Sequence, residues 1–179
     1  REDIQFVLDR EYIANIYKKY AEEGKLPLRV THNDTKLNNI MIDNKTGKGI
    51  CVIDLDTVMP GYVMNDFGDS IRFGASTAAE DETDLDKVSC SMELFRVYTA
   101  GFLKGANGQI TQTEIDLLPA GALVMTFECG MRFLTDYLQG DVYFKIHKEN
   151  HNLDRARNQF KLVADMEAKW DEMKSIVKE

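Results

Sequence analysis

A carboxylate, a carboxamide and a second carboxylate stand at spacings that suit phosphoryl transfer. Asp34 precedes Asn39 by five positions, and Asp54 follows a short β-rich run. Asp54 and the side-chain oxygen of Asn39 are hard ligands of the kind that Mg²⁺ prefers, and Mg²⁺ takes further ligands from substrate phosphates. Asp34 is placed to accept a hydrogen bond from an attacking hydroxyl, and Lys36 can neutralise charge on a transferring phosphate. This is the spacing of a kinase catalytic loop, Asp-x4-Asn, with a metal-binding Asp downstream.

A β-hairpin is predicted to bring these side chains together. Two β-rich runs, residues 40–42 and 50–53, flank a turn-forming segment rich in Asp, Asn, Gly and Lys, which is a hairpin pattern. A hairpin places the start of its first strand beside the end of its second, so Asn39 is expected opposite about Ile53. The side chains of Asp34, Asn39 and Asp54 should then converge at the open end of the hairpin.

The segments around the hairpin are predicted from periodicity and turn residues. Residues 1–23 carry a helical apolar stripe that ends at Gly24, and residues 28–31 are expected to be extended. Residues 60–76 are rich in Gly and Asp, and we expect an irregular stretch there.

Downstream of this stretch the sequence predicts only helices. The expected helices are one with an apolar face from Leu85 that closes at Gly105, one opened by a capping box at Thr111, one that runs to about Leu138, and a long one capped by Asn152. The predicted fold class is therefore mostly α, of α+β type, with one small β-hairpin that carries the loop and the metal site.

The motif residues resemble a known superfamily. The pattern His32-x-Asp34-x4-Asn39 with Ile53-Asp54 is similar to that of the aminoglycoside phosphotransferases and choline kinases, which are small-molecule kinases of protein-kinase-like fold. Residues 31–39, 52–61, 66–73 and 132–138 resemble, more narrowly, the N-acetylhexosamine 1-kinase family. The resemblance runs through nearly all of the chain, and it implies the helical C-terminal lobe of such a kinase.

The resemblance implies roles for the loop residues. Asp34 would be the catalytic base or hydroxyl-orienting residue, with Lys36 beside it, and Asn39 with Asp54 would hold Mg²⁺ and bind ATP through its phosphates. The implied reaction transfers the γ-phosphate of ATP to the anomeric hydroxyl of N-acetylglucosamine or N-acetylgalactosamine, which gives a sugar 1-phosphate.

The resemblance also implies a sugar site in the helical lobe. Arg132 and Tyr143 would grip the sugar, with Phe73 and Asp34 lining the pocket. Arg132 offers a fixed fork of donors for sugar oxygens, and a tyrosine presents both a hydroxyl and a ring. Two structural alternatives stay open, because Arg132 has the i,i+4 spacing of an ion pair with Asp136 and Tyr143 can be a core residue.

Two features depart from protein kinases. The second acidic site is Asp54-Leu55-Asp56 in place of Asp-Phe-Gly, and no Ala-Pro-Glu follows, so a protein substrate is not expected. Nothing before Asp34 offers a Gly-rich loop or a strand with a phosphate-binding Lys, and 33 residues cannot hold a five-stranded lobe as well as a helix. We therefore expect residues 1–179 to form a single domain that partners an N-terminal nucleotide lobe absent from this chain. Alone it should have little or no transfer activity.

Composition narrows the class of partner. The chain has 179 residues with 22 Lys and Arg against 30 Asp and Glu, a net charge of −8, and so acidic a chain is not expected to bind nucleic acid. The longest nearly unbroken apolar stretch, residues 120–127, is far short of the roughly 20 residues that cross a bilayer, so no membrane span is expected. Three cysteines without a Cys-x-x-Cys pair fit reduced thiols and a cytoplasmic protein.

Other functions compete with a sugar kinase. A kinase for another small alcohol, such as choline or an aminoglycoside, is the nearest alternative. The Asp54-x-Asp56 pair also fits the nucleophile strand of haloacid-dehalogenase-like phosphatases, although that fold needs several βαβ units after the motif. A third alternative is a non-catalytic pseudokinase lobe.

Some residues near the motif are expected to be structural. His32 should brace the backbone of the loop. Of Asp66 and Asp69, one is expected to cap a helix and the other to form a hydrogen bond with the loop.

Overall fold

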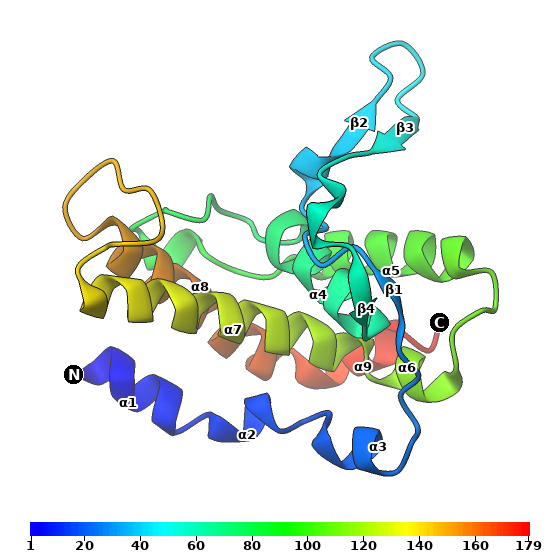
Figure 1. Cartoon of the computed structure of the whole chain (residues 1–179), viewed down its shortest axis with the longest axis horizontal. Helices are drawn as coiled ribbons and strands as arrows, with labels where there is room; N and C mark the ends of the chain where they lie inside the picture. Colours follow the sequence, from blue (N-terminus) through cyan, green and yellow to red (C-terminus); the bar gives the residue numbers. More distant parts are fainter.

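Two long helices form the body of the molecule. In the computed structural model, which describes residues 1–179, these are α7 (Leu118–Gln139) and α8 (His151–Ala168). They run antiparallel and are joined by the loop of residues 140–150 (Figure 1). A short break at Lys169 separates α8 from α9 (Trp170–Ile176), so the long last helix expected from the sequence is interrupted.

Helix α4 (Val63–Gly74) packs against α7 and carries much of the core. Phe67 of α4 is fully buried and stacks edge-on against Phe95 and Phe102. Gly68 of α4 and Gly121 of α7 face one another, and a Cβ on Gly68 would clash with the main chain of Gly121. The two glycines therefore let the helix backbones approach closely.

The prediction of an irregular stretch over residues 60–76 was wrong. Residues 59–61 form a strand and residues 63–74 form α4. Gly and Asp have low intrinsic helix propensity, but the buried apolar face and the close contact at Gly68 stabilise the helix through tertiary packing.

The N-terminal segment forms three short helices and not one. These are α1 (Glu2–Leu8), α2 (Glu11–Ala14) and α3 (Lys18–Glu22), which run along the α7–α8 pair (Figure 1). The backbone leaves the helical region at Arg10 and Asn15. Arg10 forms an ion pair with Glu167 of α8 at 3.0 Å, so a contact with a distant helix accompanies the break. The predicted end at Gly24, which has a φ of 68°, is confirmed.

The helices after α4 differ from the prediction at their ends. Residues Leu85–Lys87 form only a 3₁₀ turn (η3), and α5 (Met92–Ala106) begins after Ser91, whose hydroxyl accepts a hydrogen bond from the Leu94 amide. Gly105 lies within α5, which ends at the left-handed Asn107.

Of the two predicted N-terminal caps of later helices, one is confirmed and the other is wrong. The capping box that opens α6 (Gln112–Asp116) is confirmed, with the Thr111 and Glu114 side chains each bonded to the other's amide. Asn152 does not cap α8, because the helix begins after Asn150 and the Asn152 side chain is fully buried.

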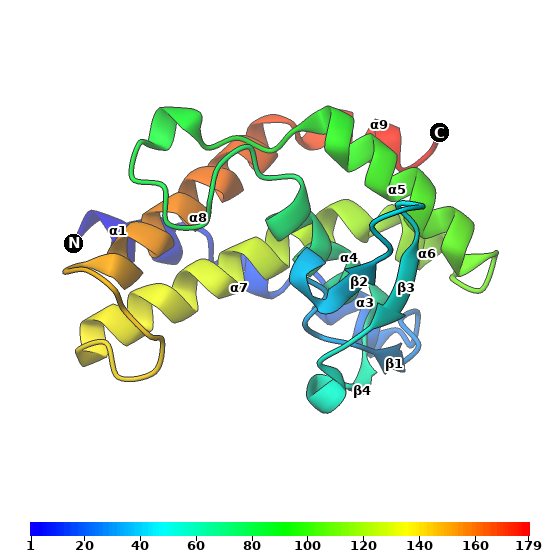
Figure 2. The same ribbon diagram turned by 90° about the horizontal axis from the view of Figure 1, so that it is seen from above.

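Two small antiparallel sheets complete the fold. Strand β1 (Arg29–Thr31) pairs with β4 (Met59–Gly61), and β2 (Ile40–Ile42) pairs with β3 (Gly49–Val52). The β2–β3 hairpin projects from the helical body (Figure 1), and Figure 2 shows it from above, beside α4 and the β1–β4 pair. The register pairs Ile40 with Val52, and the Ile53 amide donates to the Asn39 carbonyl at 2.9 Å, so the predicted hairpin and its register are confirmed.

The architecture is mostly helical with two small sheets, and it is compatible with a kinase-like C-terminal lobe. No parallel sheet is present, since both pairs of strands are antiparallel. Among the helices, none combines the length and the apolar character that crossing a membrane requires.

Candidate functional site

The loop of residues 32–39, here called the Asp34 loop, joins β1 to β2 at the root of the hairpin. Helix α4 holds the start of this loop through Asp66, whose two carboxylate oxygens accept hydrogen bonds from the amides of His32 (2.9 Å) and Asn33 (2.8 Å). One of the two acidic residues on α4 thus binds the loop, as predicted. The other does not cap a helix, because Asp69 pairs with Arg72 at 3.1 Å within α4.

His32 braces the loop, and this prediction is confirmed. Its Nδ1 accepts a hydrogen bond from the Asp34 amide at 3.3 Å, so Nε2 carries the proton and donates to the Ile53 carbonyl at 2.9 Å. One imidazole therefore joins the Asp34 loop to the end of the second hairpin strand. Thr57 adds a further link by donating to the His32 carbonyl at 2.6 Å.

Asp34 is held by two side chains on one of its oxygens. Lys36 Nζ lies 2.7 Å and Asn39 Nδ2 lies 2.9 Å from Asp34 Oδ2. Burial raises the pKa of Asp34, but the hydrogen bonds from Lys36 and Asn39 lower it by more. The net pKa of Asp34 therefore lies below its usual range. The carboxylate is therefore ionised at neutral pH, and Oδ1 is left to accept a hydrogen bond from a ligand.

Lys36 links the loop to other acidic residues. Its hydrogen bond to Asp34 raises the pKa of Lys36, and Asp54 and Asp69 raise it too by electrostatic attraction. The ammonium group is therefore charged and lies within electrostatic reach of three carboxylates. A cation in this position can attract a phosphate group as well as orient Asp34.

The residues expected to hold a metal lie at the open end of the hairpin. Asn39 is buried, and its carboxamide nitrogen is committed to the main-chain oxygen and the carboxylate of Asp34. Its carboxamide oxygen is then the atom left for a metal. Asp54 follows Ile53 directly and adopts a left-handed conformation with a φ of 63° and a ψ of 55°, a backbone state that is uncommon outside glycine and is often found at functional sites. One amide oxygen and one exposed carboxylate fit Mg²⁺, which uses few protein ligands and retains waters.

The hairpin exposes apolar side chains on both of its faces. Every residue of β2 and β3 is exposed to solvent. The exposed apolar residues in and beside the hairpin are Leu37, Ile40, Met41, Ile42, Ile50, Val52, Ile53 and Leu55. A two-stranded ribbon with two apolar faces does not bury enough surface to be stable alone in water.

A second region with polar side chains lies at the far end of α7. A cavity of about 650 Å³ is lined by Glu128, Met131, Arg132, Thr135, Asp136, Gln139, Tyr143 and Phe144. The Arg132 guanidinium lies 5.8 Å from the ring centre of Tyr143 and 5.3 Å from that of Phe144. The structure thus brings two of the sequence-predicted substrate residues, Arg132 and Tyr143, into one cavity.

The structural alternatives for these two residues were wrong. Arg132 lies 3.7 Å from Glu128 and forms no ion pair with Asp136. Tyr143 is 74% exposed and is not a core residue. Glu128 and Asp136 both lie four residues from Arg132 along α7. Asp136 does not pair with Arg132, because it is buried and accepts hydrogen bonds from main-chain amides of the following loop.

Phe73 and Asp34 lie outside this cavity. Phe73 is 37% exposed and lines a smaller cavity of about 190 Å³ with Arg72, Glu80 and Gln159 among its neighbours. Asp34 belongs to the loop at the hairpin root and lines neither of these cavities. Of the four predicted substrate residues, only Arg132 and Tyr143 therefore line this cavity.

Charged residues of α4 act electrostatically on both the Asp34 loop and the cavity at the end of α7. Asp69 acts electrostatically on Lys36 of the Asp34 loop and on Glu128 of the α7 cavity. Burial raises the pKa of Glu128, with Arg132 and Arg72 opposing that rise. One oxygen of Asp69, Oδ2, is buried without a hydrogen-bond partner, so it remains an available acceptor.

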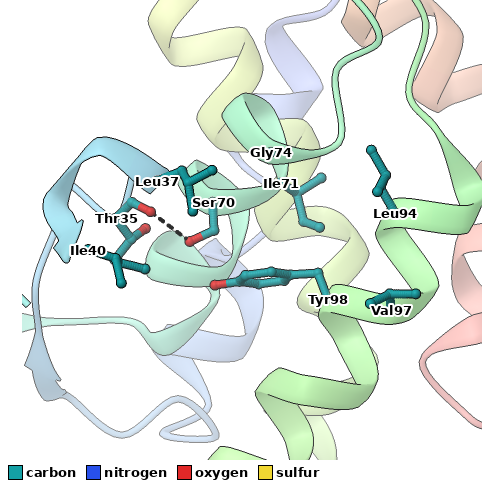
Figure 3. A pocket seen from close by; sticks show the side chains of 9 residues that line it. All are labelled: Thr35, Leu37, Ile40, Ser70, Ile71, Gly74, Leu94, Val97 and Tyr98. Atoms are coloured by element: carbon teal, nitrogen blue, oxygen red, sulfur yellow. Dashed lines mark hydrogen bonds between the residues drawn. The ribbon is translucent and has the colours of Figure 1, made fainter. Parts of the chain in front are cut away.

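An apolar pocket of about 210 Å³ flanks the other side of the hairpin root (Figure 3). It is lined by residues of the loop and β2, of α4 and of α5, namely Thr35, Leu37, Ile40, Ser70, Ile71, Gly74, Leu94, Val97 and Tyr98. Ser70 Oγ donates to the Thr35 carbonyl at 3.0 Å and fastens the loop to α4. The pocket contains no carboxylate, amide or amine side chain, so it supports the loop and offers no group for phosphoryl transfer.

Sequence reasoning missed several residues that shape the site. Asn33 has a φ of 64° and donates from Nδ2 to the Thr57 carbonyl at 3.0 Å. Glu128 and Asp136 were not recognised as cavity residues. The only local signal for Asn33 is the tolerance of Asn for left-handed backbone, and no local signal distinguishes the two acidic residues on α7.

A comparison with protein families gives a match in the first half of the chain. Residues 2–88 match the family described as the phosphotransferase enzyme family (APH). The matched span contains the Asp34 loop, the hairpin, Asp54 and α4, and it ends before the α7 cavity. The match supports the aminoglycoside phosphotransferase and choline kinase superfamily, whose members are phosphotransferases for small-molecule substrates.

Proposed function

We propose that this chain is the acceptor-binding and catalytic-loop lobe of an ATP- and Mg²⁺-dependent kinase for an N-acetylhexosamine. The observation that carries the proposal is the ionised Asp34, held by Lys36 and Asn39 at the mouth of a hairpin that leads into Asp54. This arrangement lies within the span that matches the phosphotransferase family.

Each polar group at the hairpin mouth has a task in this proposal. Asp34 Oδ1 accepts the hydrogen bond of the acceptor hydroxyl and orients it toward the phosphate. Lys36 attracts the negative charge of the transferring group. Asn39 and Asp54 would hold Mg²⁺, which neutralises charge on the ATP phosphates when bound.

The α7 cavity is proposed to bind the sugar. Its volume of about 650 Å³ lies in the range of small-molecule sites. Arg132 presents several N–H donors for sugar oxygens, and Tyr143 offers a hydroxyl and a ring face. Phe73 and Asp34, which do not line this cavity, would contact the sugar where it extends from the cavity toward the hairpin root. A guanidinium in the cavity disfavours cationic acceptors, which makes choline and aminoglycosides the second candidates.

An N-terminal nucleotide lobe is proposed as the partner that covers the hairpin. The support is the run of exposed apolar residues on both hairpin faces, including Ile40, Met41 and Val52. Surface of this kind is typical of a contact with another domain or with an apolar ligand such as a nucleobase. Activity then requires both lobes, and this chain alone should transfer little phosphate.

The phosphatase alternative has less support. A haloacid-dehalogenase-like enzyme needs a parallel sheet built from βαβ units. Here the strands are paired only antiparallel, and the chain after β4 is helical apart from short turns and loops.

A comparison of two matched substitutions tests the proposal in the two-lobed enzyme. ADP release is measured with N-acetylglucosamine, N-acetylgalactosamine, glucose, choline and an aminoglycoside as acceptors. Asp34→Asn should lower turnover by roughly 10²- to 10⁴-fold and leave Mg·ATP affinity within about twofold. The control is Asp171→Asn, since the Asp171 side chain is 94% exposed, and it should keep full turnover.

Three results would contradict parts of the proposal. If the wild-type enzyme prefers choline or an aminoglycoside, the acceptor is another small alcohol and not the proposed sugar. Unchanged transfer by Asp34→Asn would remove Asp34 from the mechanism. Phosphate release from phosphomonoesters that depends on Asp54 would favour the phosphatase.

A further inference from the structure

We propose that Asp136 is a positioning residue for the acceptor site, which holds Tyr143 and Phe144 opposite Arg132. The inference rests on the proposed function, because it assigns this task within the cavity proposed to bind the sugar. It concerns a buried residue that acts through the main chain of the loop after α7.

Asp136 is buried, with 3% of its surface exposed, and its carboxylate accepts hydrogen bonds from three consecutive amides. Oδ1 accepts from Val142 (3.0 Å) and Tyr143 (2.8 Å), and Oδ2 accepts from Phe144 (2.9 Å). The carboxylate thus fixes the main chain at the two aromatic residues that face Arg132.

Asn152 of α8 supports the same carboxylate from the other side. Its Nδ2 donates to Asp136 Oδ2 at 2.9 Å and to Asp141 Oδ1 at 2.8 Å, and the Asn152 side chain is fully buried. The end of α7, the start of α8 and the loop between them are therefore tied to one polar centre. Burial raises the pKa of Asp136, and the amides of Phe144, Tyr143 and Val142 lower it to a net value below its usual range, so the acceptor oxygens stay ionised at neutral pH.

The aromatic side chains need this anchor because their own contacts are few. Tyr143 is 74% exposed and packs edge-on against Phe144 at 4.8 Å between ring centres. Phe144 in turn packs on Phe133 of α7 at 4.7 Å. A loop that moved by an ångström would change the distance between Arg132 and both rings, since neither ring is enclosed. Misplacement of this size is enough to weaken a binding site substantially.

The alternative is that Asp136 only stabilises the end of α7. A purely structural residue would lower thermal stability without a selective effect on the acceptor. A positioning residue acts through Tyr143, so its effect on acceptor binding should disappear once the Tyr143 side chain is removed.

The test is a double-mutant cycle in the two-lobed enzyme, with the acceptor of the panel that gives the highest kcat/KM. Asp136→Asn should raise the KM for the acceptor about tenfold or more, with kcat changed less than threefold and the KM for ATP unchanged. In a Tyr143→Ala background, Asp136→Asn should change the acceptor KM by less than twofold. Asp171→Asn serves as the matched exposed control.

Hydrogen exchange provides a readout that does not need activity. Asp136→Asn should accelerate amide exchange at residues 142–144 and leave the centre of α7 protected. If Asp136→Asn does not fold, Asn152→Ala removes one support of the carboxylate and should give the same changes at smaller size.

The outcomes separate the two proposals. An acceptor KM within twofold of wild type, or an equal effect of Asp136→Asn with and without Tyr143, overturns the positioning role. If no acceptor in the panel is phosphorylated, the proposed function fails. Unchanged exchange at residues 142–144 then overturns the anchoring as well, and faster exchange supports it.

Discussion

The carboxamide nitrogen of Asn39 donates hydrogen bonds to both the main-chain oxygen and the carboxylate of Asp34, at 2.8 and 2.9 Å. Asp34 lies near the start of the loop of residues 32–39 and Asn39 at its end, so this contact closes the loop on itself. The amide nitrogen orients the proposed base, and its oxygen is left for the proposed metal. One side chain therefore connects the proposed base with the proposed metal site.

Removal of the Asn39 side chain should affect both parts. In the two-lobed enzyme we expect Asn39→Ala to lower kcat about 100-fold and to raise the Mg²⁺ concentration for half-maximal activity at least tenfold, since one ligand is lost. A magnesium titration of ADP release measures both. The control is Asn38→Ala at the exposed neighbouring position, where wild-type behaviour is expected. An unchanged magnesium requirement in Asn39→Ala would exclude Asn39 as a ligand.

Loss of Lys36 should shift the pH dependence. Lys36 holds the pKa of Asp34 down against the effect of burial, so Lys36→Met should raise that pKa. Because the base works only when ionised, the acid limb of kcat/KM should move to higher pH than in wild type. Lys45→Met, at an exposed position in the hairpin turn, should leave the profile in place. If the maximum of kcat/KM is lower in Lys36→Met but the acid limb does not move, Lys36 acts on the phosphate alone.

The contact between α4 and α7 predicts opposite effects of alanine at two helical glycines. Gly68→Ala should destabilise the fold by about 3 kcal/mol, because its Cβ would meet main chain of Gly121 that cannot yield. That corresponds to a fall in Tm of roughly 6 to 12 °C for a chain of this size. Gly101→Ala in α5, where no neighbouring atom lies within 4 Å, should stabilise by about 0.5 to 1 kcal/mol. Thermal unfolding followed by circular dichroism measures both, and equal Tm values would contradict the close approach of α4 and α7.

Glu114 should contribute stability that acid removes. Its carboxylate accepts from Arg29 Nε and Nη2, at 2.6 and 2.7 Å, and from the Thr111 amide at 2.6 Å. Burial raises the pKa of Glu114, but these contacts lower it to a net value below its usual range. The contribution is therefore present above the unfolded pKa of about 4.3 and is lost as the pH falls through the lower folded pKa.

Urea denaturation at several pH values checks this contribution. Glu114→Gln should lower the free energy of unfolding by about 2 kcal/mol at pH 7, and the difference from wild type should shrink below pH 4. Glu22→Gln, at an exposed position on α3, should match wild type throughout. A difference between Glu114→Gln and wild type that does not change with pH would show that the ion pair with Arg29 is not its origin.

Features that depend on neighbouring residues were predicted well. The hairpin and its register follow from turn residues between two β-rich runs, and the pairing of Asn39 with Ile53 follows from that register. The capping box of Thr111 and Glu114 is likewise a local exchange of two hydrogen bonds. The loop motif around Asp34 is also local, and the kinase chemistry that its spacing indicates stays a prediction.

Features that depend on distant contacts were missed. Helix α4 contains Gly68 and two aspartates that predict a loop, yet Gly68 meets Gly121 and Asp66 binds the Asp34 loop. Asn152 is of a residue type that often caps helices, but its side chain is buried and donates a hydrogen bond to Asp136. In each case a polar or small residue was assigned its usual local role, while its actual partner comes from another part of the chain.

The amino-acid sequence alone determined the residues of the proposed phosphoryl-transfer centre and the hairpin that presents them, since both rest on short-range turn and pairing preferences. Only the packed structure decided where the proposed acceptor cavity lies, which side chains line it, and that Asp136 faces the main chain of residues 142–144 rather than Arg132. The reason is physical: a buried carboxylate must find hydrogen-bond donors, and which donors it finds depends on how the helices and loops pack together.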